Sequence, residues 1–198
     1  MYIPPSYQNN NTEEIKTFVK NNSFGILVNQ TNGKPWATHI PLELQTKNEK
    51  DILVGHIAKA NPQWHNFKDN PEVLCIFNGP HSYISSSWYK DEEVPTWNYI
   101  AVHIYGKITI VDKDTAMKGL NDLVNKYEQA SECPLHLDNL SKSTLAQVNG
   151  IIAFEIEITD IQATYKLSQT REEDKPKIIE ELEKRDAGSK EIAKHMKK

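Results

Sequence analysis

The residue types with the clearest chemical use lie between Asp51 and Trp64. A strand leads there into a turn of small residues that carries one cation, Lys59, and the turn is followed by Asn61-Pro62. Asparagine is a preferred N-cap and proline a preferred first helical residue, so this pair predicts a helix start. The exposed N–H groups and dipole of a first helical turn form an anion site, which Lys59 would complete as a phosphate cradle.

The same segment can also be interpreted as a turn without a ligand. His56 could add a hydrogen bond to a bound phosphate, but the segment matches neither a Walker loop nor a GxGxxG motif. On spacing alone, an ordinary strand-to-helix turn that binds nothing is favoured over a phosphate site.

A second group of residues is aromatic and lies in the middle of the chain, interleaved with serine, threonine and asparagine. Its members are Trp64, Tyr83, Trp88, Tyr89, Trp97 and Tyr99. A planar heteroaromatic ligand needs flat apolar walls and a few hydrogen-bonding groups at its edges, and this mixture supplies both. A barrel core and dimer interface rich in tryptophan would produce the same composition.

Other chemistries lack their motifs. The seven histidines are His39, His56, His65, His81, His103, His136 and His195. They form no HExxH motif and have no paired cysteine ligands, so no metal site is predicted. His103, in an apolar strand, is expected to be a structural histidine with its hydrogen bonds satisfied. There is no GxSxG elbow and no Cys/His signature, which disfavours a hydrolase.

The cysteines and the first residues predict a cytoplasmic protein. The two cysteines lie far apart, and Cys75 sits in an apolar run that predicts a buried, inert thiol. Neither a signal sequence nor an apolar run of about 20 residues is present, so no membrane association is expected.

The charge disfavours direct binding to DNA. The formal net charge is −4, whereas proteins that bind the DNA backbone cluster lysine and arginine. Only the stretch from Lys184 to Lys198 is basic, with six basic and two acidic residues, a sum of +4. A solvated helical face explains it most simply, and no helix-turn-helix pattern is evident.

Short strands at hairpin spacing dominate the chain and predict an antiparallel barrel rather than a doubly wound sheet. Pro41 is expected to place its strand at an edge or a bulge, and Asn78-Gly79-Pro80 predicts a turn. The expected strands are Phe24 to Gln30, Trp36 to Leu44, Asp51 to Ile57, Glu72 to Phe77, His81 to Tyr89, Trp97 to Val111, and a strand pair or long bent strand over Ile151 to Leu167.

Helices are expected to flank the barrel. One begins at the N-cap Asn11, and one carries Met117 to Tyr127. A short helix is expected near Ser141 to Val148, and a helical tail from Glu172, interrupted at Gly188. The predicted organisation is a barrel domain over residues 1–170 with a helical tail, 171–198, packed on or beside it.

Several blocks, in order along most of the chain, resemble the PaiB-type FMN-binding negative transcriptional regulators. They are Met1-Tyr2-Ile3-Pro4-Pro5, Thr38-His39-Ile40-Pro41-Leu42, Gly55 to Trp64, Phe77 to Ser85, Trp88-Tyr89, Val94 to Tyr99, and Lys166-Leu167-Ser168-Gln169. Thr170 departs from the family pattern, which has asparagine there, and this affects only the contacts expected after the last strand.

The resemblance implies a split β-barrel, a homodimer, and FMN held at the interface. Thr38, His39, Ile40 and Pro41 would lie beside the isoalloxazine ring. His56, Ala58, Lys59, Asn61 and Gln63 would approach the ribityl chain and phosphate. Trp88, Trp97 and Asn98 would close the site, a part that the second subunit could supply.

The family also implies a role in controlling gene expression, with outputs such as proteases and sporulation. An indirect route through flavin or metabolite sensing, with no catalytic turnover required, fits the negative charge better than DNA binding. The alternatives are a flavin-dependent oxidoreductase, a haem-binding or haem-processing protein with His39, His56 or His81 as ligand, and DNA binding through the tail from Lys184.

Overall fold

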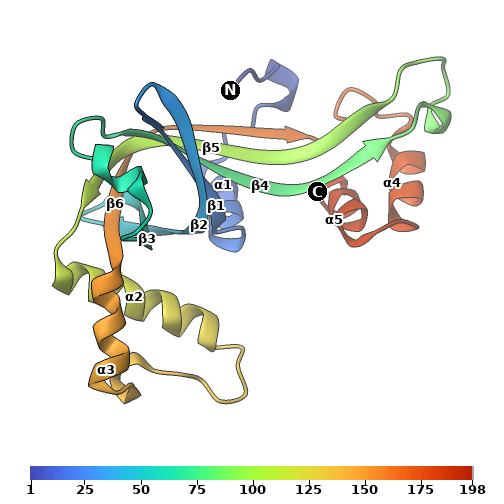
Figure 1. The fold of residues 1–198 in the computed structure, drawn as a ribbon. Coiled ribbons are helices and arrows are strands. Elements are labelled where there is room, and N and C mark those ends of the chain that lie inside the picture. The colour runs from blue at the N-terminus through green and yellow to red at the C-terminus, as the bar shows by residue number, and fades with distance from the viewer. Residues whose placement is uncertain (198) are drawn as a thin grey trace. The chain divides into compact units, whose positions relative to one another are not determined.

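The computed structural model describes residues 1–197, and its strands close into a barrel in the order β1-β2-β3-β6-β5-β4 (Figure 1). The ladders of β2 with β1 and β3, of β1 with β4, and of β3 with β6 are antiparallel. This confirms the predicted fold class, a mainly β barrel with flanking helices. The strands are β1 (Phe24–Thr31), β2 (Lys34–Lys47), β3 (Lys50–Ala58), β4 (Glu72–Ile84), β5 (Thr96–Ile110) and β6 (Ile151–Lys166).

Strand β2 changes partner at Pro41, and this residue has a ladder partner on one side only, which confirms the edge position predicted for it. Pro41 is paired with Phe24 of β1, and the ladder with β3 begins one residue later at Leu42, opposite Gly55. A proline lacks the N–H that a ladder needs on both sides. It is accommodated here because one ladder ends where the next begins.

Strand β4 is continuous, so the turn predicted at Asn78-Gly79-Pro80 was wrong. A side-chain Cβ built on Gly79 would lie 2.6 Å from Cε2 of Phe18 and 3.2 Å from Cβ of Ile100. Position 79 therefore requires glycine because the helix that carries Phe18 packs closely against the extended strand. In the sequence, a glycine of this kind cannot be told from a glycine in a turn.

The helices are α1 (Thr12–Asn21), α2 (Lys113–Glu128), α3 (Lys142–Leu145), α4 (Lys175–Glu183) and α5 (Ala187–Met196), and the short 3-10 helices are η1 (Pro5–Tyr7), η2 (Pro62–Asn66), η3 (Ser86–Trp88), η4 (Leu137–Asn139) and η5 (Ala146–Gly150). Asn11 caps α1, as predicted, by accepting from the N–H of Glu14 at 3.1 Å. The tail breaks before Asp186, which caps α5; Gly188 lies inside that helix and does not interrupt it, contrary to expectation.

The chain divides into two compact units. Unit 1 comprises Met1–Asn22, Phe77–His103 and Ile161–Lys198, and unit 2 comprises Ser23–Ile76 and Ile104–Asp160. In unit 1, α4 and α5 pack together around Ile84 through Ile178, Leu182, Ile192, Ala193 and Met196. In unit 2, the buried core includes Leu27, Leu42, Leu53, Phe154 and Ile156. The boundary predicted between residues 170 and 171 falls within unit 1, and the division into a barrel domain and a helical tail packed on or beside it stays a prediction.

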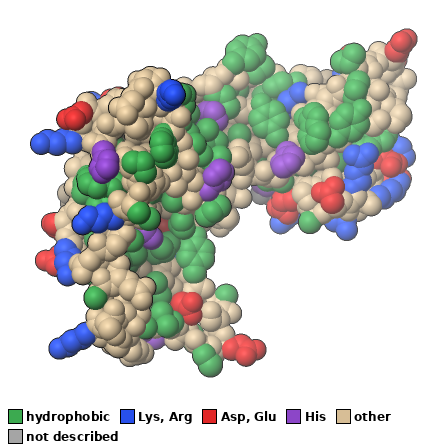
Figure 2. Space-filling view, viewed as in Figure 1, with side chains coloured by type: hydrophobic (Ala, Val, Ile, Leu, Met, Phe, Trp, Pro, Cys, Tyr) green, Lys and Arg blue, Asp and Glu red, His purple; other side chains and the backbone are tan. Residues whose placement is uncertain are grey.

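The surface carries charges of both signs. On the face drawn in Figure 2, lysine and arginine side chains are interspersed with aspartate and glutamate. Within residues 1–197, no helix combines the length and the apolar character needed to cross a bilayer.

Candidate functional site

Strands β2 and β3 are paired over only part of their length, and most of the predicted ligand-binding residues flank the opening where these two strands separate. The β2–β3 ladder ends at the pair Leu42 and Gly55. Beyond that pair, β2 follows β1 and β3 follows β6. Residues 38–41 and 56–59 therefore border the place where two neighbouring strands separate, and backbone polar groups at such an edge can bind a ligand.

A hydrogen-bonded network lies at this opening and joins three of the predicted residues. The hydroxyl of Thr38 donates to Oε1 of Gln63 at 2.6 Å and accepts from Nδ2 of Asn61 at 3.0 Å. Gln63 is completely buried, and its Nε2 donates to the carbonyl of Leu27 and to Oδ1 of Asn29, both at 3.2 Å. Gln63 thus positions Thr38 and Asn61 rather than facing solvent.

The predicted helix start is present but short. Asn61 caps η2 by accepting from the N–H of Gln63 at 3.0 Å, and Pro62 is the first helical residue, as expected. However, η2 is a 3-10 helix of five residues, so it lacks the aligned peptide dipoles of a long α-helix. The anion site predicted from a helix dipole at Asn61 is therefore not supported by this helix.

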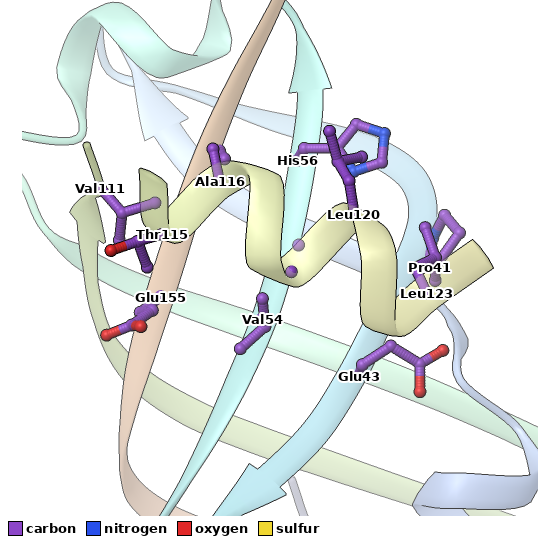
Figure 3. A pocket seen from close by; sticks show the side chains of 13 residues that line it. Pro41, Glu43, Val54, His56, Val111, Thr115, Ala116, Leu120, Leu123 and Glu155 are labelled. Carbon is purple, nitrogen blue, oxygen red and sulfur yellow. The ribbon is translucent and has the colours of Figure 1, made fainter. Parts of the chain in front are cut away.

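A narrow crevice lies between α2 and the outer face of the sheet (Figure 3). Pro41 and Glu43 enter it from β2, Val54 and His56 from β3, and Glu155 from β6; the helix contributes mainly apolar side chains. The remaining lining residues are Gly55, Val111, Thr115, Ala116, Gly119, Leu120, Leu123 and Ala153. We call this feature the α2 crevice.

His56 is a polar side chain of the crevice, and burial shifts the pKa of its imidazole. It is half-buried, and desolvation lowers the pKa of its imidazole below the ordinary value of 6.5. The ring is therefore neutral at pH 7 and presents one donor and one acceptor nitrogen. Such a ring can hydrogen-bond a polar heterocycle without adding charge to an apolar slot.

Lys59 lies in a second groove that adjoins the crevice at the start of α2. This groove shares Val111, Ala116 and Ala153 with the crevice and adds Lys59, Lys113 and Asn149. Asp112 also lines it, but its carboxylate caps α2 by accepting from the N–H of Thr115 at 2.8 Å. Two lysines and the N-terminus of a 16-residue helix thus meet in one groove, which gives it a positive character.

The remaining predicted residues of β2 and β3 differ in exposure. Ile40 points into the core with 8% of its surface exposed, so only its backbone can reach a ligand. His39 and Ala58 are exposed. The ring of His39 stacks on Phe24, with the ring centroids 6.4 Å apart.

Three predicted residues belong to unit 1. Asn98 is fully buried, and its Nδ2 donates to the hydroxyl of Ser168 at 2.9 Å. Trp88 is covered by the guanidinium of Arg185, 4.5 Å from the centroid of its ring system. Trp97 is 53% exposed on the same unit. Asn98 therefore has a structural partner, whereas Trp97 offers an exposed ring.

Sequence reasoning missed the contribution of α2. Leu120, Leu123 and Lys113 line the crevice or its adjoining groove. The apolar spacing of the helix was visible in the sequence, but nothing in it indicated that this face would cover His56. His103 was also misjudged, because its Nδ1 is buried and has no hydrogen-bond partner among residues 1–197. Its pKa is lowered, first by burial and second by the positive charge of the N-terminus.

Comparison with known proteins identifies the family. A family model described as "Putative FMN-binding domain" matches residues 1–160. The chain belongs to the PaiB-type FMN-binding family. Among its members, "Protease synthase and sporulation protein PAI 2" of Bacillus subtilis strain 168 is 48% identical over 185 residues, which cover 92% of this chain and 89% of that protein. The resemblance seen in the sequence blocks is thereby confirmed, and FMN is the cofactor that the family's description names.

Solved structures of other proteins share the barrel fold of this chain. The FAD and heme binding protein from Mycobacterium smegmatis superimposes with a TM-score of 0.64 at 13% identity, covering 81% of this chain and 73% of that one. The flavocytochrome Anf3 from Azotobacter vinelandii gives a TM-score of 0.59 at 12% identity, covering 80% and 69%. At these identities the likeness shows the fold alone, and it confirms the split-barrel class.

Proposed function

We propose that unit 2 binds FMN along α2, with the ring toward the crevice and the phosphate toward Lys59. The observation that carries this proposal is the continuity of an apolar slot with a lysine-bearing groove. From Lys113 to Leu123, α2 rises through ten steps of 1.5 Å, or about 15 Å. This length suits a tricyclic ring followed by a phosphorylated chain.

The groups present fit the chemistry of FMN. Leu120, Leu123 and Pro41 supply apolar walls, and the neutral His56 can hydrogen-bond an edge of the ring. Lys59 and Lys113 supply cations for the phosphate. When bound, FMN would contribute the redox and light-absorbing chemistry of its isoalloxazine ring.

Thr38 and Asn61 complete the proposed set of polar groups. Both have polar atoms at the opening between β2 and β3, and both are held by the buried Gln63. We assign Gln63 the role of a positioning residue, because its own amide is used within the fold.

A titration of the purified protein with FMN tests this function. We expect quenching of flavin fluorescence at a stoichiometry of one FMN per chain and a protein that turns yellow. A protein that stays colourless and leaves free FMN fluorescent would refute the proposal. A Soret band after haem addition, lost in His39→Ala or His56→Ala, would favour haem instead. Rapid anaerobic bleaching by NADH or NADPH would favour an oxidoreductase.

We also propose that any effect on gene expression is indirect. Four basic residues of the tail are already engaged. Lys184 contacts Glu180 and Glu181, Lys194 contacts Glu191, and Lys197 contacts Glu183. Arg185 stacks on Trp88 and donates to the carbonyl of Tyr83 at 3.1 Å. These contacts reduce the positive field that phosphate neutralisation requires.

Charge reversal tests the indirect route better than truncation, because Ile192, Ala193 and Met196 of α5 are buried and deleting the tail would expose a core. We expect no salt-sensitive shift of duplex DNA by the native protein at a few micromolar. A shift that Lys190→Glu/Lys194→Glu abolishes would establish direct binding and overturn this proposal.

A homodimer is proposed as the working assembly, in a cytoplasmic setting. Phe24 and Trp36 of unit 2 are 67% and 38% exposed, an unusual exposure for large aromatic side chains that an interface would cover. Sedimentation analysis at micromolar concentration should give twice the chain mass of 22.7 kDa. A sedimenting species of single-chain mass would refute the dimer.

A further inference from the structure

The segment that contains α2 is weakly packed on the rest of unit 2. Between residues 111 and 150 it forms α2, η4, α3 and η5, and none of its described side chains is buried. By contrast, the ten-residue α1 buries Ile15, Phe18 and Val19. Segments with few buried apolar contacts open locally at low free-energy cost.

The α2 crevice is too tight for a flavin while α2 stays in place. Its free space is about 20 Å³, which suffices for roughly one water molecule. In Figure 3, Leu120 and Leu123 of α2 lie close to His56 and Pro41 on the sheet. A flat ring can reach these two sheet residues only if the helix moves away.

The C-terminal end of α2 is attached to the sheet by a small polar cluster, which we call the Glu43 latch. The carboxylate of Glu43 accepts from Nζ of Lys126 at 2.6 Å and from the hydroxyl of Tyr127 at 2.8 Å. The same tyrosine hydroxyl is 2.5 Å from the hydroxyl of Ser23. Hydrogen bonds to a charged carboxylate are the stronger kind, and Glu43 is largely shielded from solvent, with 13% of its side chain exposed.

We propose that α2 is a lid over the flavin site and that the Glu43 latch holds it closed. This inference rests on the proposed FMN function and adds its regulation. FMN enters when the latch opens and α2 lifts from Pro41 and His56. Apparent affinity and association rate are both proportional to the fraction of molecules that are open, so a weaker latch gives faster and tighter binding.

A tyrosine variant tests the latch. Tyr127→Phe removes the hydroxyl shared by Glu43 and Ser23, and Tyr127 is 50% exposed, so the fold should tolerate the change. Loss of a hydrogen bond to a charged group should raise the equilibrium constant for opening of α2 by about tenfold. We expect FMN association to accelerate by about that factor, measured by stopped-flow fluorescence. Tyr2→Phe, which alters an 88% exposed tyrosine of unit 1, is the matched control.

A disulfide tests the lid itself. A Cβ on Gly119 of α2 would lie 3.2 Å from Cγ1 of Val54 on β3. Because the sulfur of a cysteine at position 54 could occupy the place of that Cγ1, the two positions are close enough for an engineered disulfide. The double variant Val54→Cys/Gly119→Cys should be made with Cys133→Ser, since Cys133 is exposed and Cys75 is buried. The oxidised protein should bind FMN at least a hundredfold more slowly, and dithiothreitol should restore the rate. Equal rates before and after reduction would overturn the lid.

A readout without flavin separates the lid from the proposed function. In Val54→Cys/Cys133→Ser, the single thiol in the crevice should react with a thiol reagent when α2 opens, and adding Tyr127→Phe should accelerate labelling about tenfold. If labelling accelerates but no form binds FMN, the lid stands and the flavin function fails. If FMN binds but labelling is unchanged by Tyr127→Phe, the flavin function stands and the latched lid fails.

Discussion

Replacing Lys59 by alanine tests the assignment of the phosphate end of the site. The side chain is exposed and lies in the groove with Lys113 and Asn149. The backbone contacts of this residue survive the change: its N–H donates to the carbonyl of Gly150 at 2.8 Å, and its carbonyl accepts from Nε1 of Trp64 at 2.9 Å. The free energy of unfolding should therefore change by less than about 0.5 kcal/mol.

The effect on FMN should be larger than the effect on folding. A hydrogen bond to a charged group contributes about 1.5–3 kcal/mol, and solvent screening of this exposed lysine lowers that range to about 1–2 kcal/mol. The dissociation constant of FMN should rise roughly five- to thirtyfold. A second cation, Lys113, remains in the groove and limits the loss.

Riboflavin provides the discriminating assay, because it carries the same ring and ribityl chain without the phosphate. Fluorescence titrations of both ligands should show Lys59→Ala weakening FMN while leaving riboflavin unchanged. Lys68→Ala, an exposed lysine that lines a different groove, should affect neither ligand. Equal weakening of FMN and riboflavin, or of neither, would refute the placement of the phosphate beside Lys59.

Three further predictions concern stability, each measurable by urea unfolding. Gly79→Ala should cost about 1–3 kcal/mol because its Cβ would meet the ring of Phe18 at 2.6 Å, whereas Gly150→Ala, with open space around it, should be neutral or slightly stabilising. Burial lowers the pKa of His56, so unfolded chains bind more protons than folded chains below pH 6.5. The free energy of unfolding should therefore fall as the pH drops from about 7 to 5.5, and His56→Asn should flatten part of that slope. An unchanged slope in the variant would contradict the assignment. Asn98→Ala should cost about 1–3 kcal/mol by leaving the buried hydroxyl of Ser168 unpaired, and a neutral effect would show that this bond is dispensable.

The sequence predicted the parts of the fold that depend on local pattern. Alternation along β2 places Ile40, Leu42 and Leu44 in the core, as their spacing required. Asn61 and Asn11 act as caps because their side chains bond N–H groups two or three residues away. These features involve neighbours in sequence, which is why a single sequence sufficed to identify them.

The failures concern contacts between distant segments. Gly79-Pro80 has the composition of a turn, but the requirement for glycine comes from Phe18, about sixty residues earlier in the chain. Likewise, a helix was predicted over Met117 to Tyr127, yet no local signal indicates that α2 lies over Pro41 and His56. Such placements depend on tertiary packing, which periodicity does not encode.

The position of α2 determines which helix can contribute to an anion site around Lys59. Considered alone, that segment offered a helix dipole at Asn61, but η2 is too short to supply one. The adjoining groove instead brings Lys59 to the N-terminus of α2, a helix more than three times as long as η2, together with Lys113. An anion site beside Lys59 therefore needs α2, and not η2, to supply the positive field of a helix N-terminus. For this reason, movement of α2 should alter phosphate binding and ring access together.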